Sequence, residues 1–210
     1  MNRKSYLSNI IKKDIYLITP NHLTKNFYHY LPKLIKTNRI AFLQIRLKSL
    51  SKKKLIEVIK KIKKITKNKT KLIINDFPEI ASQFSCEGCH IGQNDISLKK
   101  TKNNYKNLQI IGVTCHNSKK LALNAEKNGA SYIAFGAFYK TKTKKAKFHA
   151  DVDLLRWSKK NIKIPVVVIG GINEKNYKTL LLNGAKYIAC SGYIWKNTKY
   201  NPLIALKKLN

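Results

Sequence analysis

Apolar residues gather in short unbroken runs along the chain, and longer lysine-rich stretches separate these runs. Each run is four or five residues long and rich in β-branched side chains, which is typical of strands buried on both faces. The pattern therefore predicts eight buried strands, at residues 15–19, 41–45, 71–75, 88–91, 109–113, 132–135, 166–169 and 187–190.

The stretches between the runs have the spacing of helices. After the second run, apolar residues recur on one helical face at Leu50, Leu55, Val58, Ile59, Ile62 and Ile65. Strands that alternate with helices form parallel sheets through right-handed crossovers. Eight such units in 210 residues predict an α/β fold, a (β/α)8 TIM barrel. A doubly wound open sheet is the alternative, although no G-x-G-x-x-G motif follows the first run.

Length and composition favour a single domain over residues 1–210, with a short polar N-terminal extension at about residues 1–13. The chain is 43% hydrophobic and has no linker rich in Pro, Gly or Ser. No apolar run approaches the roughly 20 residues of a membrane span, and residues 1–13 lack the apolar core of a secretory signal. We expect a cytoplasmic protein without membrane contact, either as a monomer or as a homo-oligomer.

The charge of the chain is strongly positive, with 43 basic against 10 acidic residues and a formal net charge of +33. Such a field attracts phosphate backbones, so a lysine-rich nucleic-acid-binding protein is one hypothesis. Lysine, however, is a weaker reader of bases than arginine. Runs such as 52–54 and 60–61 fall on the outer faces of predicted helices, where solvated lysines are the default. We therefore expect no specific nucleic-acid partner.

The cysteines allow three interpretations. Residues 86–90, C-E-G-C-H, match the C-x-x-C-H signature of haem attachment. No export signal is present and Met1 is the only methionine, which argues against haem. A zinc site is a second interpretation, and buried free thiols of a reduced protein are the third and favoured one. The zinc ligands would be Cys86, Cys89, Cys115 and His116.

Two glycines follow the seventh predicted strand. Residues 166–176, V-V-V-I-G-G-I-N-E-K-N, change from an apolar strand through Gly170 and Gly171 to a polar helix start. Glycines let backbone N–H groups approach an anion closely, and the loops after strands seven and eight are the usual phosphate site of such barrels. The eighth strand ends at Ser191 and Gly192. The pattern predicts a backbone cradle for a phosphate, with a ligand-free tight turn as the alternative.

Polar side chains also follow the second strand. In residues 44–48, Q-I-R-L-K, the alternation of a strand puts Gln44, Arg46 and Lys48 on one face and Leu47 on the other. Two cations and an amide therefore point at one place.

Two carboxylates follow the next two strands. Asp76 comes directly after the third strand and Asp95 just beyond the fourth. Neighbouring strands lie about 4.8 Å apart, so the two side chains can share one hard cation. Mg²⁺ suits two carboxylates together with pyrophosphate oxygens. An Asx turn or a helix cap is the alternative for each residue.

Hydroxyls and an ammonium follow the fifth and sixth strands. Thr114 ends the fifth strand, and the loop after the sixth contains Thr141, Lys142, Thr143 and Lys144. These groups suit a phosphate or a pyrophosphate. The strand ends together predict two anion sites, one with a metal ion and one built from backbone.

As an ordered set, these segments resemble the thiamine phosphate synthase family over about residues 15–194. The segments are residues 44–48, 75–76, 88–95, 111–114, 141–144 and 169–172. The resemblance implies a (β/α)8 barrel that joins 4-amino-5-hydroxymethyl-2-methylpyrimidine diphosphate to 4-methyl-5-(2-phosphoethyl)thiazole. The products would be thiamine monophosphate and pyrophosphate, formed by dissociative, Mg²⁺-assisted transfer of an arylmethyl group.

The resemblance also implies roles for individual residues. Asp76 and Asp95 would hold Mg²⁺. The catalytic groups would be Arg46, Lys48, Thr114 and Lys144. The substrate-binding set would be Gln44, Ile45, Arg46, Leu47, Lys48, Asn75, Thr114, Thr141, Lys142, Thr143, Lys144, Gly171, Ser191 and Gly192.

This chain departs from the family pattern at a few positions. Leu47 stands where Glu is usual, but its side chain should point away from the ligands. Thr114 replaces a usual Ser and keeps the hydroxyl. The related thiazole tautomerase, which uses a histidine close to the position of His116, is the competing enzyme. A tautomerase has no need of the Asp76 and Asp95 pair, which favours the synthase.

Overall fold

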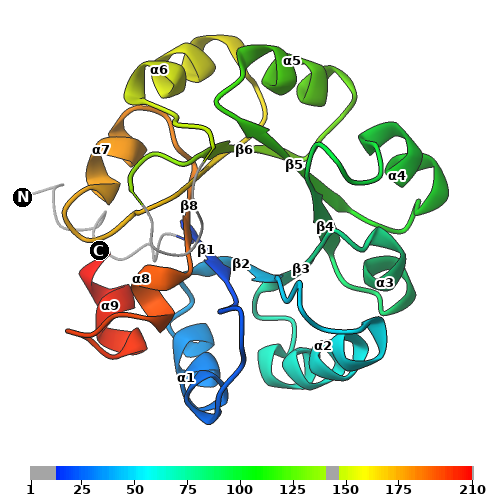
Figure 1. The fold of residues 1–210 in the computed structure, drawn as a ribbon, viewed down its shortest axis with the longest axis vertical. Coiled ribbons are helices and arrows are strands. Elements are labelled where there is room, and N and C mark those ends of the chain that lie inside the picture. Colours follow the sequence, from blue (N-terminus) through cyan, green and yellow to red (C-terminus); the bar gives the residue numbers. More distant parts are fainter. Residues whose placement is uncertain (1–12, 141–146, 210) are drawn as a thin grey trace, which may run out of the picture.

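The computed structural model describes residues 13–140 and 147–209, which form a closed barrel of parallel strands. Figure 1 looks down the barrel and shows a ring of strands inside a ring of helices. The strands pair in chain order, and the last pairs with the first, so the open sheet is wrong and the (β/α)8 barrel is confirmed. The strands are β1 (Ile15–Ile18), β2 (Ile40–Ile45), β3 (Lys71–Asn75), β4 (Gly88–Ile91), β5 (Ile110–His116), β6 (Tyr132–Gly136), β7 (Val166–Ile169) and β8 (Tyr187–Cys190).

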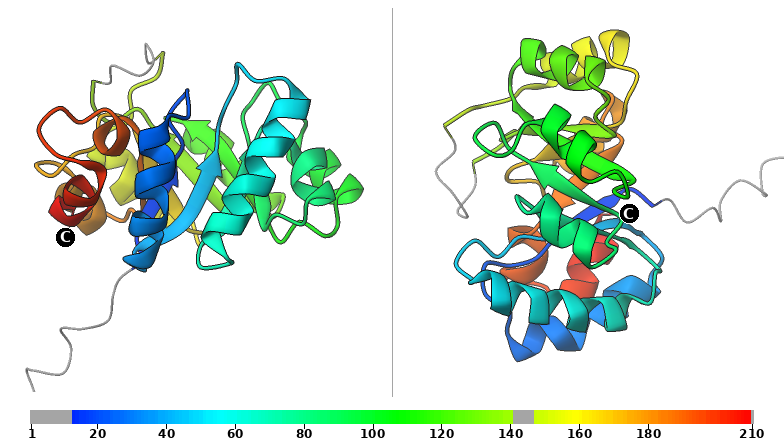
Figure 2. Two further views of the ribbon diagram at one scale, coloured as in Figure 1. Left: turned by 90° about the horizontal axis from the view of Figure 1, so that it is seen from below. Right: turned by 90° about the vertical axis from the view of Figure 1, so that its right-hand side faces the viewer.

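Helices cover the outside of the barrel, as the side views in Figure 2 show. Many begin at a side-chain cap; Ser51 and Ser97, for example, each accept a hydrogen bond from the backbone N–H three residues later. The described helices are α1 (Lys25–Lys36), α2 (Lys52–Thr66), α3 (Pro78–Gln83), α4 (Leu98–Asn104), α5 (Lys119–Lys127), α6 (Val152–Asn161), α7 (Tyr177–Leu182), α8 (Gly192–Trp195) and α9 (Pro202–Lys208).

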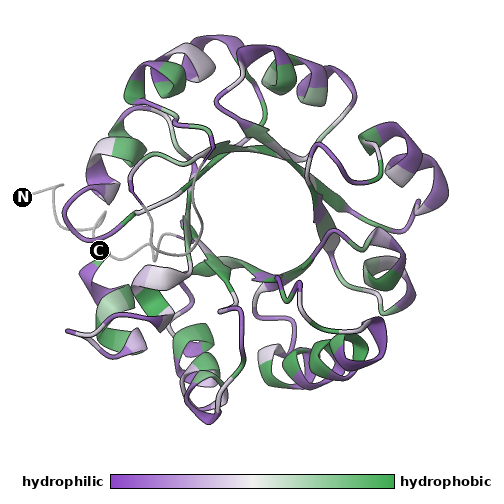
Figure 3. Cartoon of the chain, viewed as in Figure 1, coloured by the Kyte–Doolittle hydropathy of each residue, from purple (hydrophilic) through white to green (hydrophobic). Residues whose placement is uncertain are grey.

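The strands divide the apolar residues between two cores. Alternate positions such as Leu43 and Ile45 pack against the helices, whereas Tyr16 and Phe42 belong to a separate cluster inside the barrel. Figure 3 shows the apolar strands and the polar outer faces of the helices. Lys60 is exposed on the outer face of α2, as the sequence predicted. Across the described residues, no helix is long and apolar enough to cross a membrane.

Strand β5 is longer than predicted. It continues to His116, so Thr114 lies within the strand rather than at its end. The pairing with β6 shifts between Thr114 and His116, and His116 has a positive φ of 53°. A bulge of this kind lets a strand continue past a regular ladder and turns its last side chains.

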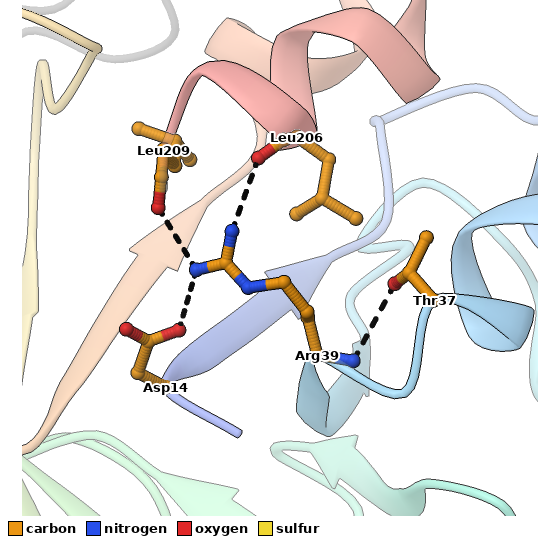
Figure 4. Close-up of polar contacts among 5 residues, drawn as sticks. All are labelled: Asp14, Thr37, Arg39, Leu206 and Leu209. Atoms are coloured by element: carbon orange, nitrogen blue, oxygen red, sulfur yellow. Dashed lines mark hydrogen bonds and ion pairs between the residues drawn. The ribbon is translucent and has the colours of Figure 1, made fainter. Parts of the chain in front are cut away.

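A partly buried ion pair joins the start of the barrel to the last helix. The Arg39 guanidinium donates to Asp14 Oδ1 at 2.9 Å and to the carbonyl of Leu209 at 2.8 Å (Figure 4). It also donates to the Leu206 carbonyl at 3.4 Å. Asp14 and Arg39 directly precede β1 and β2, so this clamp, formed by Asp14, Arg39, Leu206 and Leu209, lies at the N-terminal ends of the strands.

Candidate functional site

A cavity of about 140 Å³ opens at the C-terminal ends of the strands. Its apolar floor comes from the cluster inside the barrel, and its polar lining comes from four neighbouring strands. All of the polar lining residues except His90 were predicted from the sequence as site residues. The polar lining residues are Gln44, Arg46, Asn75, His90 and Thr114.

Strand alternation arranges the end of β2 as predicted. Arg46 lines the cavity, and its backbone N–H donates to Thr19 Oγ1 at 2.9 Å, which fixes the strand end against β1. Leu47 is buried in the core between sheet and helices, so its side chain points away from the cavity. Lys48 extends beyond the strand, and its ammonium lies 2.8 Å from Asp76 Oδ2.

The two predicted metal ligands lie close together. Asp76 has a positive φ of 65°, and its N–H donates to the carbonyl of His90 at 2.9 Å, which places it between β3 and β4. Asp95 Oδ2 accepts from the N–H of Gly92 at 2.7 Å. Burial raises the pKa of Asp95, and a hydrogen bond and charge repulsion from Asp76 raise it further, against the opposing effects of Gly92 and Lys48.

This arrangement fits a magnesium ion. Two neighbouring carboxylates, Asp76 and Asp95, repel each other, and Lys48 partly offsets their charge. In the described part of the chain, no group of three or more His, Cys, Asp or Glu side chains is placed to hold a metal ion. The protein would therefore supply two oxygens and leave the other positions to water and substrate phosphates, which is how Mg²⁺ is usually bound.

A chain of hydrogen-bonded side chains crosses the barrel beneath the cavity. Thr114 Oγ1 lies 2.8 Å from His90 Nε2, and His90 Nδ1 lies 2.9 Å from the Tyr132 hydroxyl. The hydroxyls of Tyr132 and Tyr16 are 2.7 Å apart. Burial lowers the pKa of His90 to about 4 and raises the pKa values of both tyrosines.

The sequence analysis did not assign His90, Tyr132 or Tyr16 to the site. His90 stood out only as part of the haem-like signature and of segment 88–95 in the family resemblance. The available signal was a polar side chain at an inward position of an apolar strand, which alternation alone identifies once neighbouring strands are aligned.

The glycines after β7 serve the packing of a neighbouring loop. Gly170 and Gly171 have φ values of 106° and 63°. A Cβ on Gly171 would lie 2.5 Å from the carbonyl oxygen of Lys140, so the β6–α6 loop depends on its absence. Among the described residues, the backbone N–H groups of Gly171 and Gly192 have no acceptor, which leaves them available to an anion.

The loop after β8 is anchored to β1. Ser191 Oγ donates to the Thr19 carbonyl at 3.2 Å, and Trp195 Nε1 donates to the Ile18 carbonyl at 2.8 Å. Thr141, Lys142, Thr143 and Lys144 lie outside the described residues, so their roles remain predictions. On either side of them, the Ala137 N–H donates to the Phe148 carbonyl at 3.0 Å.

The cysteines are free and buried, which confirms the favoured interpretation. Burial raises the pKa of Cys86 to about 11 and those of Cys89 and Cys115 to about 12, so the thiols are protonated at neutral pH. His116 stacks on Phe148 with ring centroids 4.2 Å apart. Nothing among the described residues supports the zinc alternative.

A (β/α)8 barrel with cations, a carboxylate pair and available backbone N–H groups around one mouth defines an enzyme that handles phosphorylated ligands. The sequence profile described as thiamine monophosphate synthase matches residues 15–194. The chain belongs to this family. The family is one of transferases, whose reaction condenses the pyrimidine diphosphate with the thiazole phosphate.

Individual relatives agree. The chain is 50% identical to a thiamine-phosphate synthase from Pelagibacter ubique, covering 95% of this chain and 97% of that protein. A thiamine-phosphate synthase from Rhodospirillum centenum is 33% identical over 93% and 95% of the two chains. The solved structure of a thiamine phosphate pyrophosphorylase from Pyrococcus furiosus has a TM-score of 0.82 at 26% identity, covering 95% and 94%.

Proposed function

We propose that this chain transfers the pyrimidinylmethyl group from its diphosphate to the nitrogen of the thiazole phosphate, giving thiamine monophosphate and pyrophosphate. One observation carries the proposal. The carboxylate pair with Lys48 and Arg46 lies at the ends of β2 to β4, and the glycine turns of β7 and β8 lie at the same mouth. Two anion sites at one mouth suit a reaction between two phosphorylated substrates.

The first site would bind the diphosphate. Arg46 and Lys48 neutralise negative charge that grows on the departing pyrophosphate, and this stabilisation is greatest in the transition state. Gln44, Asn75 and Thr114 supply amide and hydroxyl groups that orient the pyrimidine. Lys144, outside the described residues, is proposed from the resemblance to add a third cation.

Asp76 and Asp95 would hold Mg²⁺. When bound, this ion supplies positive charge to pyrophosphate oxygens and favours their departure. The two neighbouring carboxylates, whose mutual repulsion a bound cation would relieve, support this assignment.

The second site would hold the thiazole phosphate. Backbone N–H groups at Gly171, Ser191 and Gly192 would bind its phosphate, and Thr141, Lys142 and Thr143 would lie nearby, as the resemblance implies. This site fixes the thiazole nitrogen opposite the carbon that loses pyrophosphate. Because bond breaking comes first, little proton transfer is required of the protein, and orientation does most of the work.

The tautomerase alternative needs neither the carboxylate pair nor the cluster of cations at β2. His116, the residue that suggested it, stacks on Phe148 rather than lining the cavity. A lysine-rich nucleic-acid binder would not need polar groups gathered at one mouth. We further propose that the enzyme works in the cytoplasm, because the charge of its phosphorylated substrates keeps them from crossing membranes.

The test is product formation by the purified protein. With both heterocycles and Mg²⁺ present, thiamine monophosphate and pyrophosphate should appear in equal amounts, and neither should appear when either heterocycle is omitted. Isomerisation of a carboxythiazole phosphate without use of the pyrimidine diphosphate would instead support the tautomerase.

A further inference from the structure

The turn that carries Asp95 is closed on itself. The Gly92 N–H donates to Asp95 Oδ2 at 2.7 Å, and the Asp95 N–H donates to the Gly92 carbonyl at 3.4 Å. A Cβ on Gly92 would lie 3.0 Å from the same carboxylate oxygen, so a larger residue would press on the carboxylate. The carboxylate is therefore fixed within its own turn, residues 92–95, and it moves wherever this turn moves.

A glutamine side chain connects the turn to the barrel. The strands β4 and β5 are paired as far as Ile91 and Val113, and beyond these residues β4 ends while β5 continues to His116. Gln93 lies at this point, and its Nε2 donates to the Thr114 carbonyl. An amide N–H that meets a strand carbonyl acts like one more hydrogen bond between paired strands. Gln93 therefore ties the turn to β5 just beyond the end of β4.

The turn borders open space. A cavity of about 270 Å³ is lined by residues of the turn, by the start of α4 and by one face of α5. Figure 1 shows these two helices outside β4 and β5. Gly92, Gln93 and Asp95 all line this cavity, and Gln93 is exposed. Segments with few buried contacts open locally, so the position of this turn depends on its hydrogen bonds.

The partner carboxylate, Asp76, is held by other parts of the barrel. Its N–H donates to the His90 carbonyl at 2.9 Å, and its Oδ2 lies 2.8 Å from the Lys48 ammonium. Neither contact involves the turn at residues 92–95. Because Asp76 and Asp95 repel each other, the turn is pushed away from Asp76 when no cation lies between them. The spacing of the pair thus depends on how firmly Gln93 holds the turn.

We infer that Gln93 is a positioning residue for the magnesium site: its bond to the Thr114 carbonyl holds the turn so that Asp95 reaches the ion that Asp76 binds. The inference rests on the proposed function, in which these two carboxylates hold Mg²⁺. Groups that hold a metal ligand in place typically change metal affinity by about 10–100-fold. The low end of this range is expected here, because Gln93 is exposed and acts through a turn.

Metal binding without substrate tests the inference. Mn²⁺ accepts the same oxygen ligands as Mg²⁺, and the electron paramagnetic resonance signal of the free ion gives its Kd. Gln93→Met keeps the length of the side chain and removes the donor, so the Kd should rise about tenfold. Gln83→Met, at an exposed glutamine on α3, is the matched control and should bind Mn²⁺ like the unmodified protein. Equal Kd values for all three proteins would overturn the inference.

A second variant separates the hydrogen bond from folding. Gln93→Asn keeps the amide on a side chain that is one methylene shorter, so it should lose the Thr114 carbonyl and weaken Mn²⁺ binding as Gln93→Met does. Thermal unfolding should change little in both variants, because position 93 is exposed. A lower melting temperature with an unchanged Kd would mean that Gln93 serves folding alone, and the inference would be wrong.

Excess metal should restore turnover. Gln93→Met should need about tenfold more Mg²⁺ for half-maximal activity and still reach nearly the unmodified kcat at saturating Mg²⁺, because both carboxylates remain. Adding Gln93→Met to Asp95→Asn should raise the Mg²⁺ requirement no further, since Gln93 acts through Asp95. A kcat that stays low at saturating Mg²⁺, or losses that add in the double variant, would contradict a role through Asp95.

The Mn²⁺ measurement also separates this inference from the proposed function. If the unmodified protein binds Mn²⁺ but forms no thiamine monophosphate, the proposed reaction fails, whereas the Kd values of the Gln93 variants still decide the inference. If the unmodified protein binds no Mn²⁺, the metal assignment fails and the inference fails with it.

Discussion

At the end of β2, the side chains of two neighbouring residues point in opposite directions. Arg46 lines the cavity, and Leu47 packs among the helices, because successive side chains of a strand point to opposite faces. The sequence could predict this from alternation alone. It follows that a change at position 47 affects packing, whereas a change at position 46 affects the chemistry.

The metal ligands give a direct test at this scale. Asp95→Asn should raise the Mg²⁺ concentration for half-maximal activity by about tenfold or more and lower the maximal rate by about 100-fold, because a neutral amide is a weaker ligand than a carboxylate. Activity measured across a Mg²⁺ titration checks this. Asp153→Asn, at an exposed pair with Arg156, is the control, and equal Mg²⁺ dependence in both variants would contradict the assignment.

His90 predicts a dependence of stability on acid. Burial lowers its pKa to about 4, against about 6.5 in the unfolded chain, so the unfolded state binds the proton first as the pH falls. The free energy of unfolding should therefore decrease between pH 6.5 and pH 4, by about 3 kcal/mol from this residue. A cation on Asp76 would lower the pKa further and keep the sign.

Urea denaturation at several pH values measures the effect of His90. His90→Gln should lose part of the acid sensitivity, and His29→Gln, at an exposed histidine on α1, should retain all of it. Identical slopes for the two variants would show that His90 is not the group responsible.

The residues that could not be assigned to the site from the sequence were missed for a common physical reason. Tyr16 and Tyr132 lie in apolar strands, where an aromatic ring is ordinary core, and only the closure of the barrel brings their hydroxyls, on β1 and β6, to His90 on β4. The carboxylates could be predicted because each directly follows a strand, and parallel strands end at one edge. A local sequence pattern identifies single residues, whereas a hydrogen-bonded network can be recognised only when the register between the strands is known.

At the scale of elements, the turn after β7 supports the loop after β6. Tyr139 donates to the Gly170 carbonyl at 3.1 Å, and Phe138 donates to the Ile169 carbonyl at 3.1 Å. The sequence analysis offered two interpretations of these glycines, a cradle for an anion or a ligand-free tight turn. Their close contact with a loop 30 residues earlier could not be foreseen, because it depends on which loops become neighbours.

A pair of glycine variants separates strain from packing. Gly171→Ala and Gly129→Ala both force alanine into a positive φ, which costs roughly 1–2 kcal/mol. At Gly129 the obstructing atom is the flexible ammonium of Lys102, whereas at Gly171 it is the backbone of Lys140. We expect a larger loss of stability in Gly171→Ala than in Gly129→Ala, and a loss of activity of at least about tenfold only in Gly171→Ala. Thermal unfolding and turnover measure the two quantities.

The bulge in β5 shows the limit of boundary prediction. The apolar run stops at Val113, but the strand continues through Thr114 to His116 because the pairing with β6 shifts register. Periodicity could predict that a strand exists here, since the run is buried on both faces. Its end depends on the partner strand.

For the whole molecule, binding groups and the clamp lie at opposite ends of the barrel. Removing Arg39 would leave Asp14 buried and unpaired, and such losses typically cost about 3–5 kcal/mol. Arg39→Met should therefore lower the free energy of unfolding by about this amount and leave KM nearly unchanged below the melting transition. Denaturant titration measures it, and Arg156→Met, at an exposed pair, should change stability by less than about 1 kcal/mol.

The clamp also constrains the order in which the chain folds during its synthesis. Arg39 and Leu209 are 170 residues apart, and β1 meets β8 only when nearly the whole chain has been synthesised. Until then β1 has an unpaired edge, a template for aggregation, while contacts of such long range form slowly. We expect nascent and truncated chains of this protein to depend on chaperones until α9 reaches Arg39.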